Sequence, residues 1–155
     1  MKIRIAAVGR LRPGPEADLI ADYRTRFDRT GRALGLGPLD LREVEAKKGG
    51  MSAEADLLRK AAADARPIIA LDERGKLLTS PDFAGQLAKW RDAGQPEACF
   101  LIGGADGLAP ELRDMADFKL SFGKMVWPHM LARVMLVEQL YRAASILAGA
   151  PYHRE

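Results

Sequence analysis

Residues 98–108 read Ala-Cys-Phe-Leu-Ile-Gly-Gly-Ala-Asp-Gly-Leu, a short apolar run followed at once by a glycine-rich loop. A short apolar run bounded by glycine is typical of a strand that is buried on both faces. Glycine directly after a strand lets the backbone turn tightly and approach a ligand closely. The loop therefore has two interpretations, a turn that needs glycine for its geometry or one wall of a binding site.

Four further runs, outward from this stretch, have the composition of buried or half-buried strands: 2–8, 39–44, 67–71 and 118–122. The segments between the strands have helical periodicity. The expected helices cover 14 to about 34, a segment capped by Ser52, a segment opened by Ser80-Pro81, 110–115, and 128 to about 148. Strands that alternate with helices predict an α/β fold with a mainly parallel five-stranded sheet flanked by helices. In such a sheet, ligands bind outside the carboxyl ends of the strands.

The composition fits one globular domain over residues 1–155, with 48% hydrophobic and 29% charged residues. The longest apolar runs fall short of the roughly 20 residues that span a bilayer, and the first residues are too charged for a secretory signal. The single cysteine, Cys99, lies within an apolar run and is predicted to be a small buried hydrophobe. We therefore expect a cytoplasmic protein without membrane or metal partners.

Basic residues are in slight excess, and the net charge is +3. They cluster in two segments, around Arg10 and Arg12 and in the 46–51 segment, which is expected to be a mobile loop. A mildly basic chain is compatible with an RNA partner, and equally with an ordinary solvated surface.

Two common nucleotide-binding patterns do not fit the glycine loop. The dinucleotide pattern Gly-x-Gly-x-x-Gly would place glycine where Ile102 stands, and it belongs after a first strand rather than a fourth. The phosphate-loop pattern, which ends in Gly-Lys-Ser or Gly-Lys-Thr, does not occur in the chain. The loop is therefore predicted to be neither a dinucleotide-binding loop nor a phosphate-binding loop.

Another unusual loop follows the last strand and runs through Phe122, Gly123, Lys124, Met125, Val126 and Trp127. It carries a single charge, and such an apolar loop is costly to expose unless it packs against something. One interpretation is packing in the core or against another subunit. The other is a flat apolar slot for an adenine ring, whose edge backbone groups could contact.

The last expected helix, 128 to about 148, is apolar on almost every side, which predicts burial on more than one side and a symmetric partner in a domain of this size. The chain then ends in Pro-Tyr-His-Arg-Glu. An aromatic ring, an imidazole and a guanidinium together can hold single-stranded RNA bases by stacking and cationic contact. The alternative is a terminus that only packs on the surface.

Several motifs together resemble the RlmH (YbeA) family, the SPOUT-class large-subunit ribosomal RNA pseudouridine N3-methyltransferases. The resemblance spans the whole chain and is weakest over 34–58. It rests on Val-Gly at 8–9, Leu-Asp-x-x-Gly-Lys at 71–76, Leu-Ile-Gly-Gly-x-x-Gly-Leu at 101–108, Pro-His-x-x-x-Arg-Val at 128–134, Glu-Gln-Leu-Tyr-Arg-Ala at 138–143 and Pro-Tyr-His-Arg-Glu at 151–155.

The resemblance implies a SPOUT α/β-knot with a deep C-terminal trefoil knot, a rare exception to the rule that chains do not thread loops. It also implies a homodimer that acts on ribosomal RNA or the ribosome. The methyl donor S-adenosylmethionine would contact Leu71, Gly103, Phe122, Gly123, Lys124, Met125, Val126 and Trp127. The RNA site would include His129, Arg133, Tyr152, His153 and Arg154, and the last three could reach the cofactor of the partner.

Methyl transfer from a sulfonium requires neither a metal nor a covalent intermediate, so the protein's main task is to place the reactants in line. The imide nitrogen of pseudouridine must lose a proton, which makes His129 and His153 candidate bases and Arg133 and Arg154 candidate anion stabilisers. The sequence does not rank the two histidines. The alternative functions are a non-catalytic RNA-binding protein and a ribosome-assembly factor of the same fold.

Overall fold

The computed structural model describes residues 1–154, so Glu155, the last residue of the closing motif, lies outside the described residues. Strands and helices alternate along the chain, as expected. The strands are β1 (Lys2–Val8), β2 (Leu39–Val44), β3 (Ile68–Leu77), β4 (Glu97–Ile102) and β5 (Phe118–Ser121). The helices are α1 (Pro15–Arg32), α2 (Gly50–Ala62), α3 (Ser80–Asp92), α4 (Pro110–Met115) and α5 (His129–Leu147).

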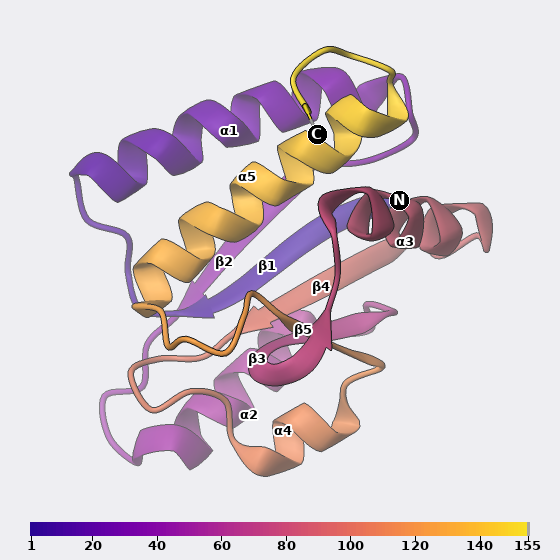
Figure 1. Ribbon diagram of the computed structural model, residues 1–155. Coiled ribbons are helices and arrows are strands. Elements are labelled where there is room, and N and C mark those ends of the chain that lie inside the picture. Colours follow the sequence, from indigo (N-terminus) through magenta and orange to yellow (C-terminus); the bar gives the residue numbers. More distant parts are fainter. Residues whose placement is uncertain (155) are drawn as a thin grey trace.

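The strands form one sheet in the order β2-β1-β4-β3-β5, and every pair of neighbouring strands is parallel. Helices α1, α3 and α5 cover one face of the sheet, and α2 and α4 cover the other (Figure 1). Alternate residues of β1 divide between the two cores: Ile3 and Ile5 pack with the first set of helices, and Ala6 and Val8 with the second. The predicted parallel five-stranded sheet flanked by helices is therefore confirmed.

Local chemistry explains several element boundaries that the sequence misplaced. Ser52 lies inside α2, which begins at Gly50 after Gly49 in the left-handed conformation, so the expected loop 46–51 is shorter than predicted. The cap of α3 is Thr79 rather than Ser80, because the Thr79 hydroxyl accepts the amide of Asp82. Pro81 then stands in the first turn, where it leaves no amide unpaired.

Strand β3 is longer than predicted. It continues through the expected loop 71–76 to Leu77, and its pairing with β5 shifts register between Leu71 and Lys76. The charged residues of this segment hid the strand, because the part of β3 beyond Ala70 pairs with β5 alone and next to a bulge, where polar side chains are tolerated.

Helix α5 is covered by its own chain on several sides, since it packs on the sheet, against α1 and against α3. Its apolar character is thus partly explained without a second subunit. Cys99 is fully buried in the core, as predicted. No helix within residues 1–154 is long and apolar enough to cross a membrane. The trefoil knot stays a prediction, because strand order and pairing do not define how a chain threads.

Candidate functional site

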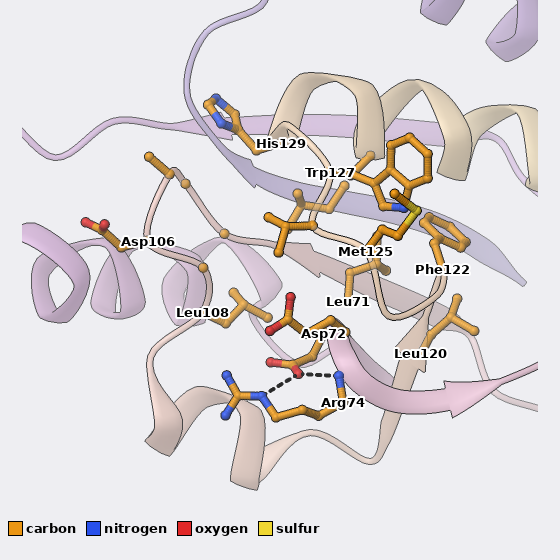
Figure 2. A pocket seen from close by; sticks show the side chains of 18 of the residues that line it. Leu71, Asp72, Arg74, Asp106, Leu108, Leu120, Phe122, Met125, Trp127 and His129 are labelled. Atoms are coloured by element: carbon orange, nitrogen blue, oxygen red, sulfur yellow. Dashed lines mark hydrogen bonds and ion pairs between the residues drawn. The ribbon is translucent and has the colours of Figure 1, made fainter.

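A cavity of about 320 Å³ opens at the carboxyl ends of β3, β4 and β5, where three loops meet. Figure 2 shows Leu71 and Leu120 inside this pocket, with Phe122, Met125 and Trp127 on one side and His129 at the rim. The volume lies in the range that small-molecule and cofactor sites occupy. The carboxyl edge of the sheet is thus hollowed where the sequence placed a ligand site.

The cavity brings together most of the residues that the sequence assigned to cofactor binding. Lys124 belongs to the same loop, but it is not among the described residues that line the cavity. The predicted cofactor residues that do line it are Leu71, Gly103, Phe122, Gly123, Met125, Val126 and Trp127.

The glycine loop after β4 closes on itself. The amide of Gly107 donates to the carbonyl of Gly104 over 3.0 Å, and Gly107 has a φ of +78°. A Cβ on Gly103 would lie 2.6 Å from the Gly107 oxygen and 2.7 Å from the Leu108 nitrogen, so this position excludes every side chain. Both interpretations of the loop hold, because the turn requires glycine and its backbone also lines the cavity.

A cluster that the sequence did not single out fixes the β3 side of the cavity. Asp72 follows Leu71 directly and is nearly buried. Its carboxylate accepts the amide of Arg74 over 2.8 Å and pairs with Arg113 of α4 at 3.1 Å, and the Arg74 side chain lies 3.3 Å away (Figure 2 draws the Asp72–Arg74 contacts). The motif Leu-Asp was visible in the sequence, whereas its partner Arg113 is distant along the chain.

The apolar loop after β5 is held at its start by Ser121. This buried hydroxyl accepts the amide of Gly123 and lies 3.0 Å from the carbonyl of Glu73. Beyond that anchor the loop is open: Met125 is 73% exposed and Val126 is 81% exposed. Phe122 packs against the core of its own chain, whereas Met125 and Val126 do not, so only the start of the loop is explained by core packing.

His129 begins α5 and lines the cavity. Its imidazole lies against the backbone of Gly9, because a Cβ on Gly9 would be 3.4 Å from the His129 Nε2. Gly9 has a φ of +98° and follows β1 directly. The backbone at the end of β1 therefore supports the imidazole of His129. Of the two predicted histidines, His129 is the one that lines the cavity of its own chain.

Arg133, one helical turn after His129, has no exposed surface. Its Nη1 pairs with the carboxylate of Glu43 at 2.8 Å, and its Nη2 donates to the carbonyls of Val8 and Gly9. Burial lowers the pKa of Arg133, and Glu43 opposes this shift. This geometry contradicts the predicted contact of Arg133 with RNA. A guanidinium that is fully buried and hydrogen-bonded inside the protein presents no donor to a ligand at the surface.

The tail turns back after α5 and packs on the second half of this helix, away from the cavity (Figure 1). The Tyr152 hydroxyl donates to Glu138 over 3.0 Å, the Arg142 guanidinium lies 4.8 Å from the centre of the Tyr152 ring, and its Nη1 is 3.3 Å from the His153 Nδ1. Burial and hydrogen bonding raise the pKa of Tyr152, so its hydroxyl stays protonated near neutral pH. Arg154 is exposed.

One chain therefore does not unite the predicted site. Helix α5 has 19 residues, and at about 1.5 Å per residue its ends are roughly 28 Å apart. The cavity and His129 lie at its first turn, whereas Tyr152 and His153 contact Glu138 and Arg142, which are about 14 and 20 Å further along the helix. Among residues 1–154, no cluster of three histidine, cysteine or acidic side chains could hold a metal ion.

A family model described as a predicted SPOUT methyltransferase matches residues 1–153. A protein named ribosomal RNA large subunit methyltransferase H from Dinoroseobacter shibae is 67% identical over 155 residues, which cover 99% of each chain. A protein of the same name from Cereibacter sphaeroides is 64% identical with the same coverage.

Two solved structures are similar in fold alone, since each is 14% identical in sequence. A probable methylase family protein from Haemophilus influenzae has a TM-score of 0.58 and covers 99% of this chain and 70% of its own. A probable methyltransferase from Bordetella pertussis has a TM-score of 0.56, with 92% of this chain and 96% of its own covered.

Proposed function

Because this chain belongs to the SPOUT methyltransferase family, in its RlmH branch, we propose that it methylates a base of large-subunit ribosomal RNA. The methyl donor is S-adenosylmethionine, and the acceptor is the N3 atom of a pseudouridine. The observation that carries the proposal is the cavity at the carboxyl edge, because it is built from the loops that the motifs singled out, in a chain that matches its relatives over their whole length.

The residues around the cavity fit the methyl donor. A volume of about 320 Å³ suits a nucleoside with a short side chain, and the backbone of the glycine loop can approach it without a side chain at Gly103. Leu71, Met125 and Trp127 offer an apolar surface for a purine ring. When bound, the donor supplies an electrophilic methyl group on sulfur. The chain's own task is to hold that group and the acceptor base in line and to exclude water.

We assign His129 as the candidate base, since it lines the cavity of its own chain. An imidazole at this rim can take the imide proton from a base that approaches from outside. His153 lies beside Arg142, about 20 Å along α5 from His129, so we expect it to act at the cavity of another chain and not at its own. Arg154, exposed beside it, suits contact with the RNA backbone.

The protein is proposed to work in the cytoplasm as a homodimer in which the tail of one chain completes the cavity of the other. Two observations support this arrangement. The tail of each chain contacts α5 at Glu138 and Arg142, about 14 and 20 Å along the helix from His129 at the cavity. Apolar side chains also remain exposed beside the cavity, among them Val126 at 81% and Leu131 at 41%.

The first experiment tests the activity. Purified protein is incubated with labelled S-adenosylmethionine and, separately, with free large-subunit RNA, the isolated large subunit and the assembled ribosome. We expect the label to enter a pseudouridine on at least one of these substrates, with the assembled ribosome methylated fastest. Failure to bind the donor in calorimetry would favour a non-catalytic RNA-binding or assembly protein instead.

The second experiment tests the shared site. Two inactive chains with different affinity tags are co-expressed, one carrying Gly103→Val and the other lacking residues 152–155, and the mixed dimer is purified. One cavity of this dimer combines an intact glycine loop with an intact tail, so we expect about half of the wild-type rate per dimer. A mixed dimer as inactive as its parents would place the tail and the cavity of one chain in the same site.

A further inference from the structure

An ion pair with a fully buried guanidinium lies one helical turn from His129. Residues four apart on a helix share a face, so Arg133 projects from the same side of α5 as His129. The Arg133 side chain is fully buried, and it lies 2.8 Å from the Glu43 carboxylate of β2. Its second nitrogen donates to the carbonyls of Val8 and Gly9, at 3.1 and 3.0 Å. The pair thus joins the start of α5 to the carboxyl ends of two strands.

The same carboxylate also holds the loop that follows β1. Glu43 accepts the backbone amide of Leu11, next to the exposed residue Arg10. The backbone of Gly9, fixed from one side by Arg133, is the surface on which the His129 imidazole lies. The ion pair therefore contacts the end of β1 and the loop that follows it, next to the backbone on which His129 lies.

Stability alone is a poor explanation for this arrangement. A guanidinium without exposed surface loses its hydration, and replacing a buried ion pair by apolar groups is often neutral or stabilising. The Arg133 Nε has no hydrogen-bond partner among residues 1–154, which adds to the cost of its burial. The burial of Arg133 costs free energy, and it occurs next to the candidate site. This combination points to a role in the geometry of that site.

We propose that Arg133 and Glu43 are positioning residues that hold His129 and the Arg10–Leu11 loop at the rim of the methyl-donor cavity. The inference rests on the proposed function and adds two residues to its machinery. Neither side chain is among the described residues that line the cavity, so losing the pair leaves donor binding intact. The loss instead displaces the base and the loop that carries the exposed Arg10, and a displacement of about 1 Å can reduce turnover a hundredfold.

The test compares Arg133→Lys, Arg133→Met and Glu43→Gln with the control Arg4→Lys. Arg4 is a matched control because it is also nearly buried, donates to two backbone carbonyls and pairs with a carboxylate at 2.8 Å, but at the other end of β1. Each variant is measured for kcat on the ribosomal substrate, for the Kd of S-adenosylmethionine by calorimetry, and for unfolding in urea.

For the three variants of the pair we expect kcat per folded molecule to fall about 10- to 100-fold, while the Kd of the donor stays within twofold of wild type. Lysine at 133 keeps the charge and should retain more activity than methionine. Arg4→Lys should lose stability but keep kcat within twofold. Glu43→Gln keeps the test usable if the Arg133 variants do not fold, since Glu43 is partly exposed.

Unchanged kcat in folded Glu43→Gln and Arg133→Lys protein would overturn the positioning role, and so would a parallel loss of donor affinity. A wild-type protein that transfers no methyl group would instead contradict the proposed function itself. The two failures are therefore distinguishable in one set of measurements.

Discussion

Two arginines are buried near opposite ends of β1, and their partners are of the same kinds. Arg4 donates to two carbonyls at the end of α2 and pairs with Glu97. Arg133 donates to two carbonyls at the end of β1 and pairs with Glu43. The first cluster closes a packed end of the sheet, and the second lies one helical turn from the cavity. The role of a buried arginine therefore depends on the site that surrounds it, because its hydrogen-bond and ion-pair partners are of the same kinds at both ends.

The largest effect is expected at the packed end. Arg4→Met removes the cation that pairs with Glu97 and donates to two carbonyls, so the free energy of unfolding should fall by about 3 kcal/mol. The rate of methyl transfer per folded molecule should not change. Urea denaturation and a rate assay below the transition check both, and a tenfold loss of rate in folded protein would break the contrast between the two ends.

The next largest effect belongs to the cavity end. A side chain at Gly103 would lie 2.6 Å from the Gly107 oxygen, so Gly103→Val must push the glycine loop apart. We expect donor affinity to fall at least a hundredfold, or about 2.7 kcal/mol. Calorimetry measures this loss. As a control, Gly85→Ala lies in α3 with no described atom within 4 Å of the new Cβ, and it should stabilise the helix without changing affinity.

The sequence predicted the strands and the loops of the cavity end well. The sequence predicted β1 and β2 to the residue: β1 has the apolar composition of a buried parallel strand, and β2 has the mixed composition of a half-buried one. The loops after β4 and β5 were recognisable from glycine and from apolar residues that a surface loop does not need. These local patterns sufficed to place the cavity.

The long-range pairs were not visible. Arg113 lies 41 residues from Asp72, and Arg133 lies 90 residues from Glu43, so no spacing pattern connects either pair. The family resemblance implied that Arg133 contacts RNA, and a basic residue one turn after a histidine gives no sign of its burial. Strand β3 was cut short for a related reason, since its charged continuation is held by pairing with β5 rather than by its own composition.

The smallest expected effect is a dependence of stability on pH, and it tests how well the Arg4 end of the sheet excludes water. Cys99 pairs in register with Arg4, and burial raises the pKa of its thiol to about 12, against the opposing charge of Arg4. The unfolded chain ionises this thiol near pH 9, so the free energy of unfolding falls as pH rises from there towards 12.

At pH 10 this term amounts to about 1 kcal/mol. Cys99→Ala should therefore show a flatter decline than wild type when urea midpoints are compared at pH 8 and pH 10. Equal declines in the two proteins would mean that the thiol is accessible to water in the folded state, and that the Arg4 end of the sheet is less closed than the structure indicates.

Helix α5 has one consequence for how such a protein can change over time. No glycine or proline interrupts its 19 residues, so it is a rigid spacer between the cavity end and the tail. Inserting a single residue would rotate everything beyond it by about 100° and carry the tail to another side of the molecule. Substitutions along the helix are therefore tolerable wherever packing permits, whereas a change in its length moves the tail relative to the cavity end.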